Sequence, residues 1–128
     1  MSRRARVLVI DDDLACRVLA ALLLEKAGYS PTAVGSVERG LERLEDEGAD
    51  VVVTDLLMPD QSGLDLLLAL RERQSAVPVI VMTGSGDLEL LALALELGAS
   101  SVLRKPYSPE ALGAAVSGAL LRERPEAA

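Results

Sequence analysis

Five apolar runs alternate with five segments of helical pattern along nearly the whole chain. The runs at 6–10, 51–53 and 77–83 are rich in β-branched residues and almost free of polar ones, which is typical of strands covered on both faces. The expected strands are 6–10, 30–34, 50–55, 77–83 and 100–104. The expected helices are 14–27, 37–47 capped by Ser36, 63–73, 87–97, and 109–121 capped by Ser108. This (βα)5 order predicts a doubly wound α/β fold, in which a five-stranded parallel sheet lies between two layers of helices.

The composition is that of one globular domain over residues 1–128, in which residues 122–128 are expected to form a frayed polar tail. Half of the residues are apolar, which argues against disorder. No apolar run has the length of a membrane span, and the first residues lack a signal-peptide pattern. The single cysteine, Cys16, excludes an internal disulfide and fits a reducing compartment, so a cytoplasmic location is expected.

The charge and the missing residue types exclude several classes of function. The net charge of −7 argues against nonspecific nucleic-acid binding by this domain. The chain has no histidine, which removes the commonest metal ligand and the usual general base. Its aromatic residues are Tyr29 and Tyr107 alone, so neither a base-stacking surface nor a flavin site is expected.

Polar side chains stand at the ends of four of the five expected strands. They are Asp11 and Asp12 after the first strand, Asp55 at the end of the third, Thr83 at the end of the fourth and Lys105 after the fifth. The carboxyl ends of parallel strands meet at one edge of the sheet, where ligands bind in α/β folds. Taken singly, these residues have ordinary explanations: a helix cap, a turn acid, a buried strand hydroxyl and a solvated lysine. Their combination at one edge indicates a site for phosphoryl chemistry with Asp55 as the nucleophile.

The charges at this edge favour binding of a divalent cation. Two carboxylates about 4 Å apart repel by roughly 4 kcal/mol at an effective dielectric constant of ~20. Asp11, Asp12 and Asp55 carry three negative charges and Lys105 returns one positive charge, so the remaining −2 matches a divalent ion. An all-oxygen ligand set without histidine or cysteine suits Mg²⁺. Two other acids are expected to be structural: the helix cap Asp13 and the turn residue Asp60.

Together these residues resemble the receiver domain of two-component response regulators, the CheY-like proteins, over essentially the whole chain. The resemblance is carried by the pair Asp11-Asp12, the segment from Asp55 to Pro59 with Gly63, Thr83, and the pair Lys105-Pro106. It implies the flavodoxin-like strand order 2-1-3-4-5. It also implies a signalling module rather than an enzyme, one that catalyses only its own phosphorylation and dephosphorylation.

The resemblance also implies a role for each residue of the site. Mg²⁺ would be bound by the carboxylates of Asp12 and Asp55 and the backbone carbonyl of Leu57, with Asp11 acting mainly through water. Asp55 would be the phosphoacceptor, Thr83 the switch hydroxyl, and Lys105 the partner of Asp55 or of its phosphate. The Lys105–Pro106 peptide bond is expected to be cis. The implied partner is a sensor histidine kinase or a phosphotransfer protein, because the donor is a phosphohistidine and this chain has no histidine.

The sequence departs from the family pattern in the fifth strand and near the phosphoacceptor. Val102 stands where many family members carry a Tyr or Phe that turns inward with the switch hydroxyl, so a smaller repacking or a weaker coupling is expected. Leu57 and Ser85 occupy positions that tune loss of the phosphoryl group in the family. Apolar Leu57 is expected to hinder the attacking water and to lengthen the phosphorylated state.

The first helix has Leu14, Val18, Leu19, Leu22 and Leu23 near one face, which is expected to be its buried face. The fourth and last helices carry more apolar residues than a single buried face requires. In the fourth, Leu88, Leu91 and Leu95 are expected to face the core, with Leu90, Leu93 or Leu97 partly outward. The last has a similar surplus in Ala111, Leu112, Ala115, Val116, Ala119 and Leu120. The surplus reflects either a Leu/Ala-rich composition or a partner or homodimer face formed by the fourth helix, fifth strand and fifth helix.

Other functions compete with the receiver hypothesis. A phosphohydrolase with an aspartate nucleophile usually needs a second acid two residues later, where this chain has Leu57. A nucleotide binder would need a glycine-rich phosphate motif, and neither of the common ones is present. A receiver-like domain used only for docking would not need the acids, Thr83 and Lys105. The kinase, the output, and whether the chain is a stand-alone regulator or part of a longer one stay open.

Overall fold

The computed structural model describes residues 3–59, 61–84, 86 and 88–123. The strands are β1 (Arg6–Ile10), β2 (Ser30–Val34), β3 (Val51–Asp55), β4 (Val79–Thr83) and β5 (Ser101–Arg104). The helices are α1 (Leu14–Lys26), α2 (Val37–Asp46), α3 (Gly63–Glu72), α4 (Leu88–Glu96) and α5 (Pro109–Glu123). Every expected element is present, with ends shifted by two residues or fewer. Residues 124–128 of the expected tail lie outside the described residues, and α5 includes the first two of its residues.

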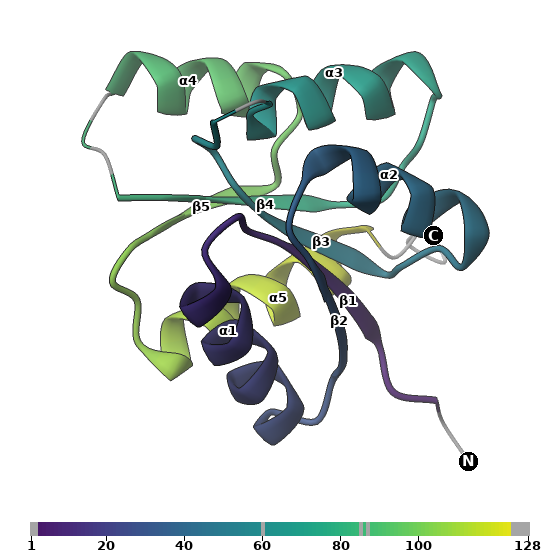
Figure 1. The fold of residues 1–128 in the computed structure, drawn as a ribbon, viewed down its shortest axis with the longest axis vertical. Helices are drawn as coiled ribbons and strands as arrows, with labels where there is room; N and C mark the ends of the chain where they lie inside the picture. Colours follow the sequence, from purple (N-terminus) through teal and green to yellow (C-terminus); the bar gives the residue numbers. More distant parts are fainter. Residues whose placement is uncertain (1–2, 60, 85, 87, 124–128) are drawn as a thin grey trace.

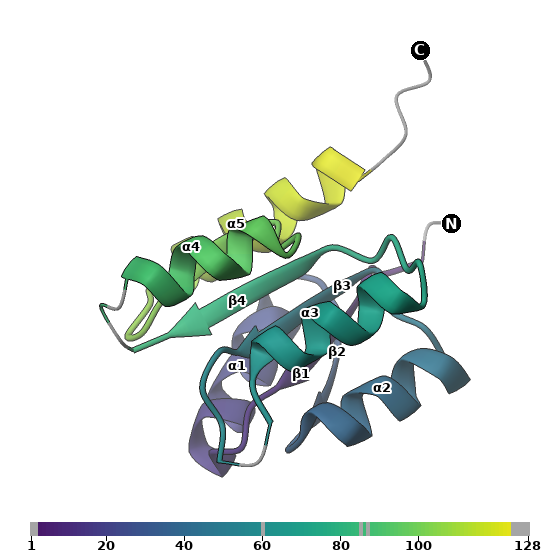
Figure 2. The same cartoon turned by 90° about the horizontal axis from the view of Figure 1, so that it is seen from above.

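The strands form one parallel sheet in the order β2-β1-β3-β4-β5, which confirms the expected class and topology. Helices α1 and α5 cover one face, and α2, α3 and α4 cover the other (Figures 1 and 2). Each crossover therefore returns the chain to the same end of the sheet. All five strand C-termini meet at a single edge.

The core consists of two clusters, one on each face of the sheet. Consecutive valines of β3 serve both: Val52 packs on the side of α2, α3 and α4, whereas Val51 and Val53 pack on the side of α1 and α5. All three are fully buried. The run of adjacent β-branched residues in this strand follows from cover on both faces.

Helix α1 does not bury the face that the sequence suggested. Ala20 and Leu24 are its buried residues, and Leu23 packs partly against the core. Four of the five residues expected to share a buried face have about half or more of their surface exposed: Leu14 at 64%, Val18 at 48%, Leu19 at 52% and Leu22 at 55%. The small side chain of Ala20 lets the helix lie close to the sheet. This contact, and not the number of leucines, sets the rotation of the helix about its axis.

Helix α4 also corrects the expectation. Its buried residue is Ala94, and Leu90, Leu91 and Leu97 pack around it against the core. Leu88 and Leu95, expected to face the core, are 77% and 50% exposed. The expectation was right for Leu91, which packs inward, and for Leu93, which is 41% exposed.

Helix α5 has no broad apolar surplus among its described side chains. Leu112, Val116 and Ala119 are buried, and Ala111, Ala115 and Leu120 pack against the same cluster. The exposed large apolar side chain on this helix is Leu121. No helix in the described part of the chain has both the length and the apolar character that a bilayer crossing requires.

Candidate functional site

Asp11, Asp55 and Lys105 reach the same face of the sheet because of strand alternation. Every second side chain of a strand lies on one face. Val9 and Val53 pack under α1 and α5, and Asp11 and Asp55 each follow two residues later. Lys105 keeps the same spacing from buried Leu103 of β5. Register aligns the strand ends, since Ile10 pairs with Thr54 and Asp55 with Met82.

The Lys105 ammonium bridges the two acids contributed by β1 and β3. Its Nζ lies 2.8 Å from Oδ2 of Asp11 and 3.2 Å from Oδ2 of Asp55. The Asp11 side chain is 1% exposed, that of Asp55 14% and that of Lys105 22%. The sequence expectation that this lysine pairs with the aspartate of β3 therefore agrees with the geometry.

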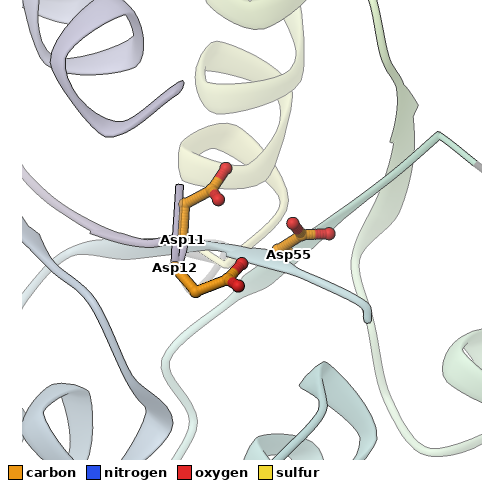
Figure 3. A group of neighbouring side chains, drawn as sticks. All are labelled: Asp11, Asp12 and Asp55. Atoms are coloured by element: carbon orange, nitrogen blue, oxygen red, sulfur yellow. The ribbon is translucent and has the colours of Figure 1, made fainter. Parts of the chain in front are cut away.

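Asp12 completes a cluster of three carboxylates. Each of Asp11, Asp12 and Asp55 offers an oxygen, and these oxygens lie within 4.8 Å of one another. Figure 3 shows the three side chains at the ends of β1 and β3. Asp11 is buried, Asp55 partly buried and Asp12 exposed, so the cluster is open to solvent on one side.

Burial and the neighbouring charges act in opposite directions on Asp55. Burial raises the pKa of its carboxyl above the ordinary value, and the negative charge of Asp11 adds to this. The charge and hydrogen bond of Lys105 lower the pKa of Asp55 without offsetting the burial. The ionised carboxylate is therefore incompletely neutralised by the protein itself.

Lys105 is held in its charged form. Burial lowers the pKa of its ammonium, but the hydrogen bonds and charges of Asp11 and Asp55 outweigh that effect and leave the pKa above its ordinary value. This result and the raised pKa of Asp55 describe one lysine shared by two carboxylates. The ammonium has two carboxylate partners, whereas the two carboxylates share a single positive charge.

Asp11 is anchored at its backbone and at both carboxylate oxygens. Its N–H donates to the Val34 carbonyl at 3.1 Å and so extends the pairing of β1 with β2. Oδ1 accepts from the Asp13 N–H at 3.0 Å, and Oδ2 from Lys105. Its carbonyl oxygen accepts from Nη1 of Arg17 at 2.9 Å, a contact that sequence reasoning missed. The only signal available was an arginine one turn into the helix that follows the acids.

Asp13 and Thr83 each form a hydrogen bond with a residue of the site: the Asp13 N–H donates to Asp11 and the Thr83 carbonyl accepts from Lys105. The Asp13 side chain accepts from the Cys16 N–H, which confirms it as the N-cap of α1. Thr83 lies two residues after buried Val81, so its side chain leaves the strand on the face covered by α2, α3 and α4. That side chain is 1% exposed. The carbonyl of Thr83 accepts from the Lys105 N–H at 2.8 Å.

The peptide bond between Lys105 and Pro106 is cis, as the resemblance implied. The turn that it forms follows β5 directly. The Lys105 ammonium, carried on the first residue of this turn, reaches back across the sheet edge to β1 and β3.

The loop after Asp55 is held close to the site by Gly63. A Cβ atom at this position would lie 3.0 Å from the Asp55 carbonyl oxygen and 3.2 Å from Cα of Leu56, so the start of α3 packs directly on backbone. The Gly63 N–H donates to the Leu56 carbonyl at 2.9 Å. Leu57 is 51% exposed. Asp60, expected to form a turn, lies outside the described residues.

The donor set fits a hard divalent cation. The groups that converge are carboxylate oxygens of three aspartates, the ligand type that Mg²⁺ prefers. Their negative charge exceeds the positive charge of Lys105, and the exposed Asp12 gives an ion a route from solvent.

Two further groups stand near the ammonium. Cys16 and Tyr107 both feel the charge of Lys105, which lowers their pKa values, yet burial raises the pKa of each above its ordinary value. Both therefore remain protonated at neutral pH and add no charge to the site.

Comparison with known proteins adds three findings. The family model for the response regulator receiver domain matches residues 7–117. The transcriptional regulatory protein FixJ of Bradyrhizobium diazoefficiens is 35% identical over 127 residues, which cover 99% of this chain and 62% of that protein. The sensory transduction protein RegX3 of Mycolicibacterium smegmatis is 39% identical over 116 residues, which cover 91% of this chain and 50% of that protein.

Solved structures agree with the observed fold. A response regulator receiver domain protein from Clostridium thermocellum superposes with a TM-score of 0.87 at 36% identity, covering 93% of this chain and 96% of that one. Full-length FixJ from B. japonicum superposes with a TM-score of 0.89 at 34% identity, covering 97% of this chain and 61% of that one. The chain thus spans between half and two thirds of the length of these two curated relatives.

Proposed function

The chain belongs to the response regulator receiver domain family, and we propose that Asp55 is the side chain on which it accepts a phosphoryl group. Receiver domains take this group from histidine kinases, so the chain is a signalling domain rather than an enzyme acting on other substrates. The burial and pairing of the three acids support Asp55. Asp11 is buried with both carboxylate oxygens engaged, and Asp12 is exposed with no lysine partner among the described residues. Asp55 contacts Lys105 and is still partly open to solvent.

The metal in this proposal is Mg²⁺, held by Asp12, Asp55 and the backbone carbonyl of Leu57, with Asp11 acting mainly through water. The convergence of three carboxylates supports this assignment. When bound, the ion would offset negative charge on the phosphoryl oxygens. The ion and the ammonium would then lie on the same edge of the sheet as the nucleophile.

The chain's own residues carry the transfer as follows. A carboxylate oxygen of Asp55 forms the new bond to phosphorus while the bond from phosphorus to the donor nitrogen breaks, and the electron pair leaves with the donor imidazole. The Lys105 ammonium, 3.2 Å from Asp55, stabilises the charge of the transferred group. The Thr83 hydroxyl then binds a phosphoryl oxygen.

The phosphorylated state would be read on the far side of the sheet. Thr83 is buried beside β5, since its Cα pairs with that of Arg104. Movement of its side chain toward the phosphoryl group would favour a second arrangement of α4 and β5. Val102 of β5 is too small to act as the aromatic reporter found in many relatives, so the shift is expected to be a modest repacking.

The proposed partners follow from the same assignment. The donor is a sensor histidine kinase or a phosphotransfer protein, and a homodimer through the face of α4, β5 and α5 is the proposed output. We propose that this domain acts in the cytoplasm and does not itself bind nucleic acid, because its net charge is −7. DNA binding by relatives such as the DNA-binding response regulator MtrA is proposed to belong to the rest of those proteins, since the chain covers 54–55% of them.

Incubation with acetyl phosphate and Mg²⁺, followed by intact-mass measurement, tests the function. The expected result is one phosphoryl adduct that disappears in Asp55→Asn and when the metal is chelated. The matched control is Asp13→Asn, because Asp13 caps α1 and asparagine caps equally well. Steady release of phosphate without an adduct would indicate a phosphohydrolase, and an adduct that persists in Asp55→Asn would refute the assignment.

A further inference from the structure

Arg17 of α1 holds the backbone from which the two acids that follow β1, Asp11 and Asp12, project. Its Nη1 donates to the Asp11 carbonyl oxygen at 2.9 Å. This carbonyl belongs to the peptide unit that joins Asp11 to Asp12. The hydrogen bond therefore restrains the plane of that unit, which contains the nitrogen and Cα of Asp12. It thereby restrains the point from which the Asp12 side chain projects.

The guanidinium lies where a side chain on residue 35 would crowd it. A Cβ atom on Gly35 would lie 2.8 Å from Nη1 and 3.5 Å from Cζ of Arg17. β1 and β2 end side by side, with Ile10 paired to Val34. The guanidinium thus fits between the loops that follow these two strands and touches both.

Asp12 is the member of the carboxylate cluster that depends on this restraint. The Asp11 carboxylate is fixed by its own bonds to the Asp13 N–H and Lys105. In the described part of the chain, no hydrogen bond to the Asp12 carboxylate is formed. The place of that carboxylate within 4.8 Å of its neighbours therefore follows from the backbone at the Asp11–Asp12 peptide and from the Asp12 side-chain rotamer alone.

We propose that Arg17 is a positioning residue for the divalent cation, and that it acts by fixing the Asp11–Asp12 peptide so that the Asp12 carboxylate faces Asp55. This inference rests on the proposed metal site. It makes a prediction opposite to that of simple electrostatics, because a guanidinium close to a cation site repels the ion. If Arg17 acted only through its charge, its removal would strengthen metal binding; as a positioning residue, its removal weakens it.

Titration with Mn²⁺, in which the free ion is followed by electron paramagnetic resonance, measures the affinity directly. Arg17→Ala is expected to weaken Mn²⁺ binding by about tenfold, as is usual when a group that orients a metal ligand is lost. In the acetyl phosphate reaction, the rate of this variant should recover at saturating Mg²⁺. Arg17→Met, which keeps the aliphatic stem, replaces the alanine variant if the latter does not fold.

Gly35→Ala is the matched variant because it leaves the arginine and its charge in place. The new methyl group displaces the guanidinium, which has room in the adjoining hollow of about 640 Å³ lined by Arg17, Gly35 and Ser36 among others. Gly35 has no left-handed φ, so alanine suits the backbone. The expected result is weaker Mn²⁺ binding in the wild-type background and no further loss in the Arg17→Ala background.

Three results would overturn the inference. The first is unchanged or tighter Mn²⁺ binding by Arg17→Ala, and the second is a rate defect that persists at saturating Mg²⁺. The third is an equal effect of Gly35→Ala with and without Arg17, because the glycine would then act independently. A wild-type protein that binds no Mn²⁺ would instead refute the proposed metal site itself, so the two failures are distinguishable.

Discussion

The burial of Asp55 lowers the free energy of unfolding of the metal-free protein at neutral pH. Its pKa is raised, chiefly by burial, above the value in the unfolded chain. A raised carboxyl pKa stabilises the fold below the unfolded-state pKa, and this contribution is lost as the pH rises through the folded-state pKa. At neutral pH the ionised carboxylate therefore no longer contributes, and its burial opposes folding.

Asp55→Asn is accordingly expected to raise the free energy of unfolding at neutral pH without metal, while Lys105 keeps its shorter contact to Asp11. The gain should vanish when the pH falls below the ordinary aspartate range. At a Mg²⁺ concentration of about 100 times Kd, the wild type should gain about 2.7 kcal/mol, and the variant less. Urea unfolding with and without Mg²⁺ measures both effects. A variant less stable than the wild type in the metal-free state would contradict this prediction.

Leu57 is expected to protect the phosphoryl group from water. It lies two residues after Asp55 and is 51% exposed, so its apolar side chain stands at the surface beside the site. Leu57→Asn should shorten the lifetime of the adduct several-fold, because an amide can hydrogen-bond an attacking water. Decay of the adduct after removal of acetyl phosphate, followed by mass, is the measurement. Leu68→Asn, a similarly exposed leucine on α3, is the control, and equal lifetimes for both variants would exclude the role.

At the scale of single elements, the start of α3 is fixed by a capping box. The Ser62 side chain accepts from the N–H groups of Leu64 and Asp65, and the Asp65 carboxylate accepts from the Ser62 N–H at 2.8 Å. Ser62→Ala is expected to lower the free energy of unfolding by about 1 kcal/mol. Ser62→Asn should retain most of it. Thermal unfolding of both variants decides the matter, and equal losses would show that the cap is not the cause.

The rotation of α4 gives a second test at this scale. Ala94 is fully buried and Leu95 is 50% exposed. Ala94→Leu is therefore expected to cost about 1–3 kcal/mol through overpacking. Leu95→Ala should change the free energy of unfolding by less than about 0.5 kcal/mol, as surface changes usually do. Chemical denaturation distinguishes this from the core position that the sequence suggested for Leu95, which would cost about 2–5 kcal/mol.

At the scale of the whole molecule, α4 presents an apolar flank at the β5 end of the sheet. Leu88 and Leu95 are two turns apart on the helix, so they lie on one flank, and α4 is the last helix of its layer (Figure 1). Leu97 and Glu96 instead line a hollow shared with α3, on the other flank. The exposed leucines thus belong to the surface proposed for self-association.

Sedimentation velocity with and without beryllofluoride, a phosphate mimic, tests this surface. The wild type is expected to form dimers with the mimic, and Leu88→Ser combined with Leu95→Ser should remain monomeric. The matched control changes Leu19 and Leu22 to serine, since these leucines of α1 are similarly exposed on the opposite layer. A wild type that stays monomeric in both conditions would rule out dimerisation linked to phosphorylation.

The sequence by itself determined the class of the fold and the convergence of Asp11, Asp55 and Lys105 at one edge of the sheet. Buried runs alternating with helices allow few arrangements, and parallel strands bring their carboxyl ends to one edge. Asp11, Asp55 and Lys105 each follow an apolar run, so their convergence could be predicted from spacing alone. The strand order came from the resemblance, because adjacency in a sheet depends on pairings between distant segments.

The tertiary structure decided which surfaces are buried and how each acid is held. Helices α1 and α4 have apolar residues nearly all round, so their periodicity leaves the rotation open, and contact of Ala20 and Ala94 with the sheet settles it. The different exposures of Asp11, Asp12 and Asp55 arise from neighbours distant in sequence. The same holds for the fit of Arg17 over Gly35, since a side chain's surroundings exist only once the strands have come together.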